Sequence, residues 1–376
     1  MIRLSKSCLS AEEKKAVMDV LDREYLGMGA DVHKFEEALS AFFGRTAVCV
    51  SNGTAAVQLA VQACGIGAGD EVLVPSLTYL ATFQAISATG AVPVACEVEE
   101  HSCILDCKDA EKRLTKKTRA IIPVHYSGGV GNINEIYAFA AKHNLRVIED
   151  AAHAFGTIHN TKKVGGFGDI ACFSFDGIKN ITSGEGGCVV TDDQTVLSLI
   201  RDARLLGIEK DTEKRFTGQR SWEFDVKIQG WRYHMSNIMA AIGLVQLTRF
   251  DGLAAKRQQL AKRYDELLSD TSDIKLLDRD YSKVVPHIYV VRISSQFDKK
   301  DLQASLLERG IQTGIHYMPN HLLSFYKNDQ QLPFPVTEKV YSELLTLPLH
   351  PDIGMEDVEY VCKSFLKLLS EKKSND

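Results

Sequence analysis

The sequence has no apolar stretch that approaches the roughly 18 residues needed to span a bilayer, and its first residues, Met1 to Lys6, lack the apolar run of a signal peptide. It also has no basic block, because its 44 basic and 49 acidic residues are spread along the chain and give a formal charge of −5. Proteins that bind nucleic acid usually gather Lys and Arg on one surface. We therefore predict a cytoplasmic protein with no nucleic-acid partner and no membrane partner.

Paired cysteines and nucleotide signatures are also missing. The nine cysteines form no Cys-x-x-Cys pair, and no second Cys or His pair accompanies the closest two, Cys103 and Cys107. A zinc site needs four ligands at such spacings, so we expect reduced thiols and no metal. The chain contains neither the Gly-Lys-Ser/Thr of a P-loop nor the Gly-x-Gly-x-x-Gly of a dinucleotide-binding turn. Nucleotide hydrolysis and nicotinamide chemistry are therefore disfavoured.

The remaining composition is that of an ordinary globular enzyme, with 45% hydrophobic and 25% charged residues. Ser10 and Glu13 form a capping box that opens a helix, and a second helical repeat ends at Gly44. Short β-rich runs then alternate with helical segments, which is typical of a parallel sheet with crossover helices. Most of these runs are continuously apolar, as in strands covered on both faces: 47–50, 71–74, 92–96, 120–124, 146–148, 171–175 and 187–190.

These runs predict an α/β fold in which a large domain, residues 1–250, holds about seven mainly parallel strands between two layers of helices. The pattern changes near Leu253. From there we expect a smaller α+β domain, residues 251–376, whose elements are a helix to about Ser269, a strand 287–293, a helix 300–309, a strand 312–317 and a helix 355–370.

Three segments of the large domain carry residues suited to chemistry. In Ser51 to Ala56 a strand ends in a tight turn and a helix begins with small residues. A helix N-terminus of this kind can bind a phosphate, and Thr54 adds a hydroxyl. An ordinary N-cap explains the same pattern about equally well.

The second segment places Asp150 and His153 directly after an apolar strand. Ligands of open α/β sheets bind at the carboxyl ends of strands, and a carboxylate there can keep a pyridinium nitrogen protonated. The alternative is that Asp150 caps the next helix and His153 is a packed polar residue.

The third segment places Lys179 on a glycine-rich turn that follows the strand ending at Phe175. A partly desolvated lysine loses its proton more easily and can attack a carbonyl to form an imine. Most lysines are solvated surface charges, but the flanking Phe173, Phe175 and the run 184–187 argue against that here.

Taken together, these segments resemble the DegT/DnrJ/StrS-type sugar aminotransferases, which are fold-type I pyridoxal phosphate enzymes acting on nucleotide-linked keto-deoxysugars. The resemblance spans nearly the whole chain and rests on six motifs: Gly29 to Val32, Asn52 to Ala56, Pro75 to Tyr79, Pro123 to Tyr126, Glu149 to His153, and Lys179. It implies an aspartate-aminotransferase-like fold and a homodimer with its active site at the interface.

The resemblance also implies roles for individual residues. Lys179 would hold pyridoxal 5′-phosphate through an imine and shuttle protons, and Asp150 would pair with the pyridine nitrogen. His153 would lie near the phenolic oxygen, and Tyr79 would stack on the ring. The cofactor phosphate would be held by Thr54, the backbone of Ala55 and Ser174. The expected reaction moves an amino group from an amino acid, usually L-glutamate, to the keto-sugar by ping-pong kinetics.

Two segments of the chain bear on the substrate. The run 179–187 resembles relatives that aminate C4 of a 4-keto-6-deoxyhexose, such as the dTDP-linked 4-keto-6-deoxyglucose; relatives acting at C3 tend to carry Tyr-Pro before the lysine and Leu-Gly-Ala-Leu-Gly-Asp after it. We expect a 4-amino-4,6-dideoxy sugar for a polysaccharide such as the O-antigen of lipopolysaccharide. Thr313 to Tyr317 matches a strand that approaches the sugar, so His316 and Tyr317 are candidate substrate contacts. A histidine on a partly exposed strand is an equal alternative for His316.

Three positions depart from the family pattern or vary within it. Relatives usually place asparagine where this chain has Arg232, to reach the cofactor phosphate of the partner subunit, and arginine where it has His234. Either residue could still reach that phosphate. Asp176 stands where several relatives carry His or Tyr, and it could tune stereochemistry or donor choice.

Four other functions compete with C4 amination. A C3 aminotransferase is the nearest. A relative with the same fold that dehydrates sugars has histidine in place of the lysine, which Lys179 opposes. A cofactor-binding regulator without catalysis would not need Asp150, Ser174 and Lys179 together. A nicotinamide dehydrogenase would need the glycine fingerprint that the chain lacks.

Overall fold

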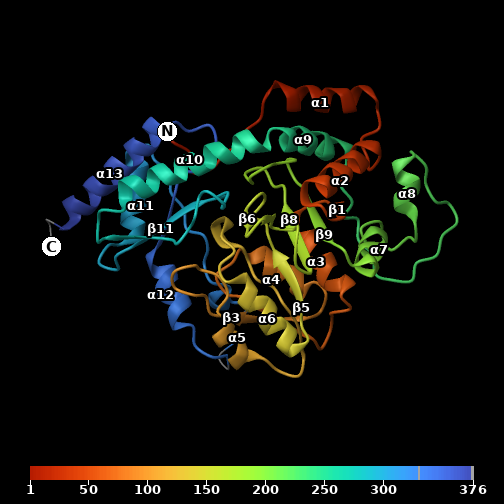
Figure 1. The fold of residues 1–376 in the computed structure, drawn as a ribbon, viewed down its shortest axis with the longest axis horizontal. Coiled ribbons are helices and arrows are strands. Elements are labelled where there is room, and N and C mark those ends of the chain that lie inside the picture. Colours follow the sequence, from red (N-terminus) through yellow and green to blue (C-terminus); the bar gives the residue numbers. More distant parts are fainter. Residues whose placement is uncertain (329–330, 374–376) are drawn as a thin grey trace.

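A computed structural model describes residues 1–328 and 331–373 and contains a central seven-stranded sheet (Figure 1). Its strand order is β1-β9-β8-β5-β4-β2-β3, and β9 alone runs antiparallel to its neighbours. The strands are β1 (Ala47–Val50), β2 (Glu71–Pro75), β3 (Val92–Cys96), β4 (Thr118–Ile121), β5 (Arg146–Asp150), β8 (Ile170–Ser174) and β9 (Gly187–Thr191). The predicted mainly parallel sheet is confirmed.

Helices cover both faces of this sheet, which explains why consecutive positions in most of its strands are apolar. Along β1, Val48 packs into the core beneath α3, whereas Cys49 packs into the core on the opposite face, beneath α2. The helices of this region are α1 (Ala11–Asp22), α2 (Ala30–Phe43), α3 (Gly53–Ala63), α4 (Leu80–Ser87), α5 (Cys107–Arg113), α6 (Ile133–His143), α7 (Gln194–Ala203), α8 (Asp211–Phe216) and α9 (Asn237–Thr248). The hairpin β6 (Ile158–His159) and β7 (Lys162–Lys163) lies outside the sheet.

The predicted helix signals near the N-terminus are confirmed. The Ser10 side chain accepts from the first turn of α1, and the Glu13 carboxylate accepts the backbone N–H of Ser10 at 2.6 Å. Helix α2 ends at Gly44, whose φ of 70° is in the left-handed region that glycine adopts without strain.

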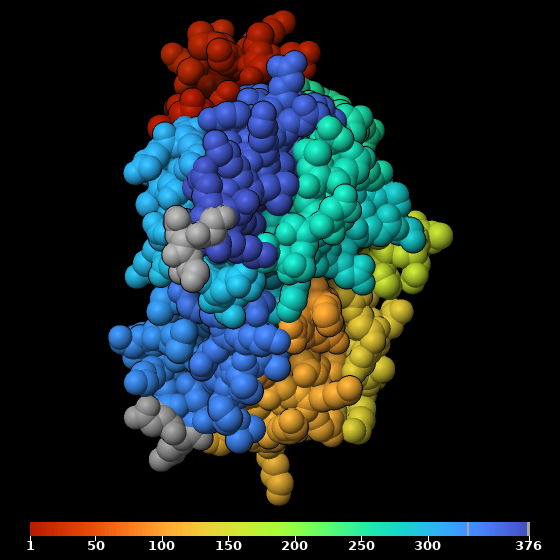
Figure 2. All heavy atoms as spheres, turned by 90° about the vertical axis from the view of Figure 1, so that its left-hand side faces the viewer, coloured from red at the N-terminus to blue at the C-terminus, as the bar shows by residue number. Residues whose placement is uncertain are grey.

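The C-terminal part of the chain forms a three-stranded sheet with helices against it. Its strands, in the order β10-β11-β12, are β10 (Ile274–Leu276), β11 (Tyr289–Ile293) and β12 (Leu344–Leu347). Its helices are α10 (Phe250–Leu268), α11 (Lys299–Glu308), α12 (Pro335–Glu343) and α13 (Met355–Lys373). Figure 2 shows α13 and α10 side by side on its surface. The first residues of the chain also join this region, because Ile2 pairs with Ile311.

The predicted strand 312–317 is wrong. The segment pairs with β12 at one position only, Gly314 with Thr346. Beyond it, His316 bonds to the Thr346 hydroxyl and Tyr317 bonds to His153, so these side chains anchor the segment in place of a backbone ladder. The third strand of the small sheet is β12 instead, where we predicted no strand.

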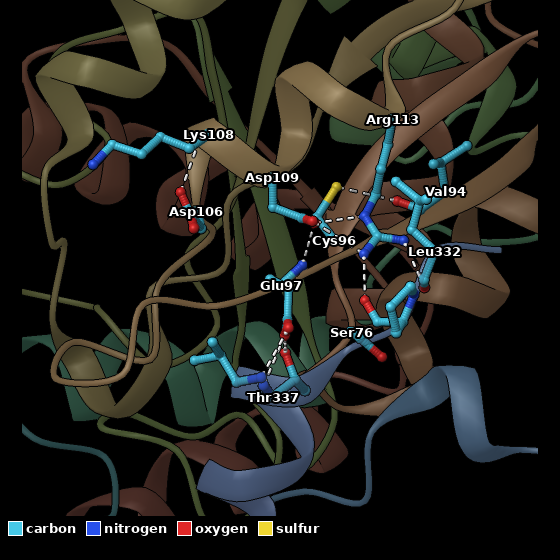
Figure 3. Close-up of polar contacts among 12 residues, drawn as sticks. Ser76, Val94, Cys96, Glu97, Asp106, Lys108, Asp109, Arg113, Leu332 and Thr337 are labelled. Carbon is cyan, nitrogen blue, oxygen red and sulfur yellow. Dashed lines mark hydrogen bonds and ion pairs between the residues drawn. The ribbon is translucent and has the colours of Figure 1, made fainter.

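Buried polar contacts attach α12 to the large sheet (Figure 3). The Glu97 carboxylate, just beyond β3, accepts the backbone N–H groups of Val336 at 2.9 Å and Thr337 at 2.7 Å. It thereby caps the first turn of α12 from 239 residues away in the sequence. Arg113 of α5 pairs with Asp109 and also donates to the carbonyl of Leu332.

Within the described residues, no single helix is both long and apolar enough to cross a membrane. Only α9 and α10 taken together reach the required length and hydropathy, and a bend of 64° separates them.

Candidate active site

The strand directions bring the three predicted segments to one edge of the sheet. β1, β8 and β5 run the same way and end at this edge, and β9 begins there because it runs in the opposite direction. The first turn of α3, the Asp150 carboxylate and the loop carrying Lys179 therefore surround one cavity of about 500 Å³. Of the predicted site residues, those lining it are Thr54, Tyr79, Asp150, His153, Ser174, Lys179, His316 and Tyr317.

Lys179 lies in the loop between β8 and β9, with its amine inside the cavity. Burial, together with the nearby charge of Arg257, lowers the pKa of Lys179 to about 8, against the opposing charges of Asp150 and Asp176. The amine therefore loses its proton far more readily than that of a surface lysine. Its Nζ lies 3.4 Å from Nε2 of His287.

Asp150 ends β5 with its carboxylate fixed on both oxygens. Oδ2 accepts a hydrogen bond from the Thr82 hydroxyl at 2.7 Å, and Oδ1 accepts the backbone N–H of Ala152 at 3.2 Å. The side chain is nearly buried, yet it lines the cavity. A carboxylate held in this way can accept a hydrogen bond from a protonated nitrogen of a ligand in the cavity.

Three imidazoles surround the lysine: His153 and His287 are buried, and His316 is partly buried. His153 accepts the Ser127 backbone N–H on Nδ1 at 3.4 Å, so its Nε2–H faces the Tyr317 hydroxyl at 3.0 Å. Burial and the Lys179 charge hold the pKa values of His153 and His287 well below the usual range, and the same two causes lower that of His316 to about 4. All three rings are thus neutral at pH 7.

The turn between β1 and α3 approaches the end of β8 closely. A Cβ atom on Gly53 would lie 2.7 Å from Cβ of Ser174, so only glycine permits this approach. The Ser174 hydroxyl and the N-terminus of α3 consequently meet at one corner of the cavity. The backbone N–H of Ala55, in contrast, already donates to the Asn52 side chain at 2.8 Å.

This set of groups fits pyridoxal phosphate. It combines a buried amine of low pKa, a fixed carboxylate and hydroxyls at a helix N-terminus, which match the aldehyde, the ring nitrogen and the phosphate of that cofactor. Tyr79 is 60% exposed at the mouth of the cavity, 5.3 Å from the Tyr317 ring between centroids, and is free to cover a flat ligand.

The structure does not bring Arg232 and His234 to this cavity. Neither lines it: Arg232 is exposed and pairs with Leu205, whereas His234 has a buried Nδ1 with no partner among the described residues. Asp176, the variable position, does line the cavity, as does Glu185.

Two residues of the site, His287 and Thr82, are not predicted from the sequence. His287 precedes β11 and faces an amine 108 residues away in the sequence. Thr82 follows Tyr79, the N-cap residue of α4, by three positions, and both residues line the cavity. That spacing from a predicted site residue was the available signal for Thr82; none pointed to His287.

Known proteins match this chain over almost its whole length. A family model described as the DegT/DnrJ/EryC1/StrS aminotransferase family matches residues 7–366. The spore coat polysaccharide biosynthesis protein SpsC of Bacillus subtilis is 33% identical over 365 residues, covering 95% of this chain and 94% of SpsC.

Solved structures agree. Helicobacter pylori PseC, an aminotransferase involved in the biosynthesis of pseudoaminic acid, superimposes with a TM-score of 0.89 at 30% identity and covers 97% of this chain and 98% of its own. Spr1654 of Streptococcus pneumoniae, known in a PLP form, gives a TM-score of 0.91 at 28% identity over 99% of both chains. The predicted enzyme class and aspartate-aminotransferase-like fold are confirmed, and the predicted cofactor is the one in that relative. The chain belongs to the DegT/DnrJ/EryC1/StrS aminotransferase family.

Proposed function

We propose that this chain is a cytoplasmic, pyridoxal-phosphate-dependent aminotransferase that moves the amino group of L-glutamate to C4 of a nucleotide-linked 4-keto-6-deoxyhexose, giving a 4-amino-4,6-dideoxy sugar for a surface polysaccharide. The observation that carries the proposal is the amine of Lys179, whose pKa burial lowers to about 8 in a cavity that also holds the Asp150 carboxylate. Family membership and the polysaccharide role in the name of SpsC support it.

Lys179, Asp150 and Thr82 have different roles in the proposed reaction. Pyridoxal phosphate supplies an aldehyde for an amine and a ring that withdraws electrons from the α-carbon of the bound amino acid. Lys179 holds the cofactor covalently and, once released, moves a proton at that α-carbon. Asp150 keeps the ring nitrogen protonated, and Thr82 fixes the orientation of Asp150.

The other cavity residues bind and orient. Thr54 and Ser174 hold the phosphate at the N-terminus of α3, and Ala55 contributes its N–H only if Asn52 releases it. Tyr79 covers the ring. His153 would lie beside the phenolic oxygen of the cofactor, and Tyr317 and Ser127 fix the position of its ring. His316 and Tyr317 face the sugar.

We further propose that the enzyme is a homodimer in which Arg232 or His234 reaches the cofactor phosphate of the second subunit. Both residues lie outside the cavity of their own subunit. They follow a segment with three exposed apolar side chains, Trp222, Phe224 and Val226. A second copy of the chain would cover these side chains. Light scattering of wild type and of Trp222→Asp tests this, since the variant should shift toward monomer. A wild type that is monomeric at micromolar concentration contradicts it.

The C4 assignment rests on the residues after Lys179 and is tested by a substrate panel. Purified enzyme with glutamate and pyridoxal phosphate is incubated separately with nucleotide-linked 4-keto and 3-keto 6-deoxyhexoses, and amino sugars are detected by mass spectrometry. We expect product from the 4-keto compound only, and none with Lys179→Ala. Product from the 3-keto compound alone identifies a C3 aminotransferase. Failure of Lys179→Ala to lose activity contradicts the role of the lysine.

A further inference from the structure

Arg257 is a buried arginine behind the reactive lysine. It lies on α10, is only 2% exposed, and forms no ion pair with a carboxylate among the residues that the structure describes. Burial lowers its pKa to about 10, so the guanidinium still carries its charge at pH 7. A buried, charged group without a counter-charge is costly, which makes a purely structural role a poor explanation for this residue.

The guanidinium binds three backbone carbonyls from different parts of the chain. Nη1 donates to His287 at 3.1 Å and to Leu349 at 3.3 Å, and Nη2 donates to Ile178 at 3.4 Å. Ile178 immediately precedes Lys179, and His287 is the residue whose ring faces the Lys179 amine. One side chain thus fastens the main chain on both sides of the contact between lysine and imidazole.

His287 is placed to accept a hydrogen bond from the amine. The residue is 3% exposed, its Nε2 lies 3.4 Å from Nζ of Lys179, and its ring packs against that of His153 with centroids 4.5 Å apart. Nδ1 has no partner among the described residues, so the ring depends on its backbone for orientation. That backbone is held by Arg257.

We propose that Arg257 is a positioning residue for Lys179. By binding the carbonyls of both Ile178 and His287, its guanidinium fixes the amine and the imidazole that accepts a hydrogen bond from that amine. It also places a positive charge beside both groups. This inference rests on the proposed function only in taking Lys179 as the reactive amine. His287 holds the released amine in the cavity, and Arg257 holds His287.

The charge of Arg257 has a measurable consequence for the amine. The titratable and charged groups around Lys179 are Asp150 on β5, Asp176 on its own loop, Arg257 on α10, and the imidazoles of His153, His287 and His316. Asp150 and Asp176 favour the protonated amine, and Arg257 opposes them. Removal of the Arg257 charge alone should therefore make Lys179 harder to deprotonate.

The charge is tested by labelling the full-length chain after its cofactor has been removed with hydroxylamine. Trace acetic anhydride is applied between pH 6 and 10, and labelled Lys179 is quantified by peptide mass spectrometry. We expect a midpoint near 8 in the wild type, a rise of about one pH unit in Arg257→Gln, and an unchanged midpoint in Arg257→Lys. Arg263→Gln, on the exposed side of the same helix, is the matched control. Equal midpoints for Arg257→Gln and Arg257→Lys overturn the electrostatic part.

The positioning is tested on the holoenzyme through His287, without disturbing the guanidinium. Gln at this position keeps an acceptor near that of Nε2, whereas Phe keeps a ring without one. With α-deuterated glutamate, His287→Phe should show a larger isotope effect on kcat than His287→Gln, at similar KM. Equal isotope effects overturn the positioning part. The labelling experiment needs neither glutamate nor a sugar. It therefore still measures the effect of Arg257 on Lys179 if the proposed reaction is wrong.

Discussion

The hydroxyl of Thr82 donates a 2.7 Å hydrogen bond to the Asp150 carboxylate, and both side chains are almost fully buried. Thr82 lies on α4 and Asp150 at the end of β5, so this bond joins a helix that covers the sheet to the strand that carries the charge. The Thr78 hydroxyl lies 3.1 Å from that of Thr82 and extends the network. The orientation of Asp150 is therefore set from outside its own strand.

Thr82→Val should lower kcat/KM roughly 10- to 100-fold, because a hydrogen bond to a charged group contributes about 1.5–3 kcal/mol. Thr82→Ser keeps the hydroxyl and should stay within about threefold of the wild type. Steady-state kinetics at saturating cofactor measure both. If Val and Ser behave alike, the bond does not orient Asp150.

The histidines around Lys179 should make the fold sensitive to mild acid. Burial lowers the pKa values of His153 and His287 well below 6.5 and that of His316 to about 4. The unfolded chain therefore takes up protons near pH 6.5 that the folded chain accepts only at a lower pH, which is about 4 in the case of His316. The contribution of these histidines to the free energy of unfolding is therefore complete above pH 6.5. It decreases as the pH falls below 6.5, by about 1.4 kcal/mol per pH unit for each such histidine.

Urea unfolding at fixed protein concentration between pH 7.5 and 4.5 measures this slope. His316→Gln should flatten it by the share of one histidine, whereas His33→Gln, in an exposed position on α2, should not. A wild-type slope that stays flat down to pH 4.5 contradicts the expectation.

Gly53→Ala should weaken cofactor binding at least tenfold, because its Cβ would lie 2.7 Å from that of Ser174 and separate the two sides of the proposed phosphate site. Gly252→Ala is the control: no atom lies within 4 Å of a Cβ there, and helix α10 should be unchanged or stabilised by up to about 1 kcal/mol. Titration of the cofactor-free chains with pyridoxal phosphate gives the two dissociation constants. Equal constants contradict the steric argument.

Glu97→Gln should lower the free energy of unfolding by about 1–2 kcal/mol, since the carboxylate caps α12 through the N–H groups of Val336 and Thr337. Glu99→Gln, two positions along and bonded locally to Ser102, should cost less than about 0.5 kcal/mol. Denaturant unfolding of both variants provides the comparison. An equal loss in both would mean that the cap on α12 contributes little.

The sequence predicts most of the large sheet because its signals are local. Continuous apolar runs gave all seven strands, and the capping box at Ser10 gave the start of α1. The small sheet is harder: Leu344–Leu347 directly follows a helix, and four apolar residues fit a strand or a buried helical turn equally well. The segment 312–317 looks like a strand but is anchored by side chains.

The residues of the site also divide into those that local sequence signals predict and those that they do not. Thr54, Asp150, Ser174 and Lys179 follow strand ends, where topology brings ligand-binding residues together, and the structure places all four around one cavity. His287 joins the site through contacts with Lys179, His153 and Arg257, and Arg257 joins it through three carbonyls spread along the chain. No spacing rule links such residues before the fold is known.

The reversed direction of β9 has a consequence for engineering the enzyme. Because β8 and β9 are antiparallel neighbours, with Ser174 paired to Gly187, the loop that carries Lys179 leaves and returns at the same point of the sheet. The pairing fixes both ends of the loop, so we expect a loop of the same length from a relative to keep the amine in place. We expect a loop one residue longer or shorter to displace the amine and abolish activity, whatever its sequence.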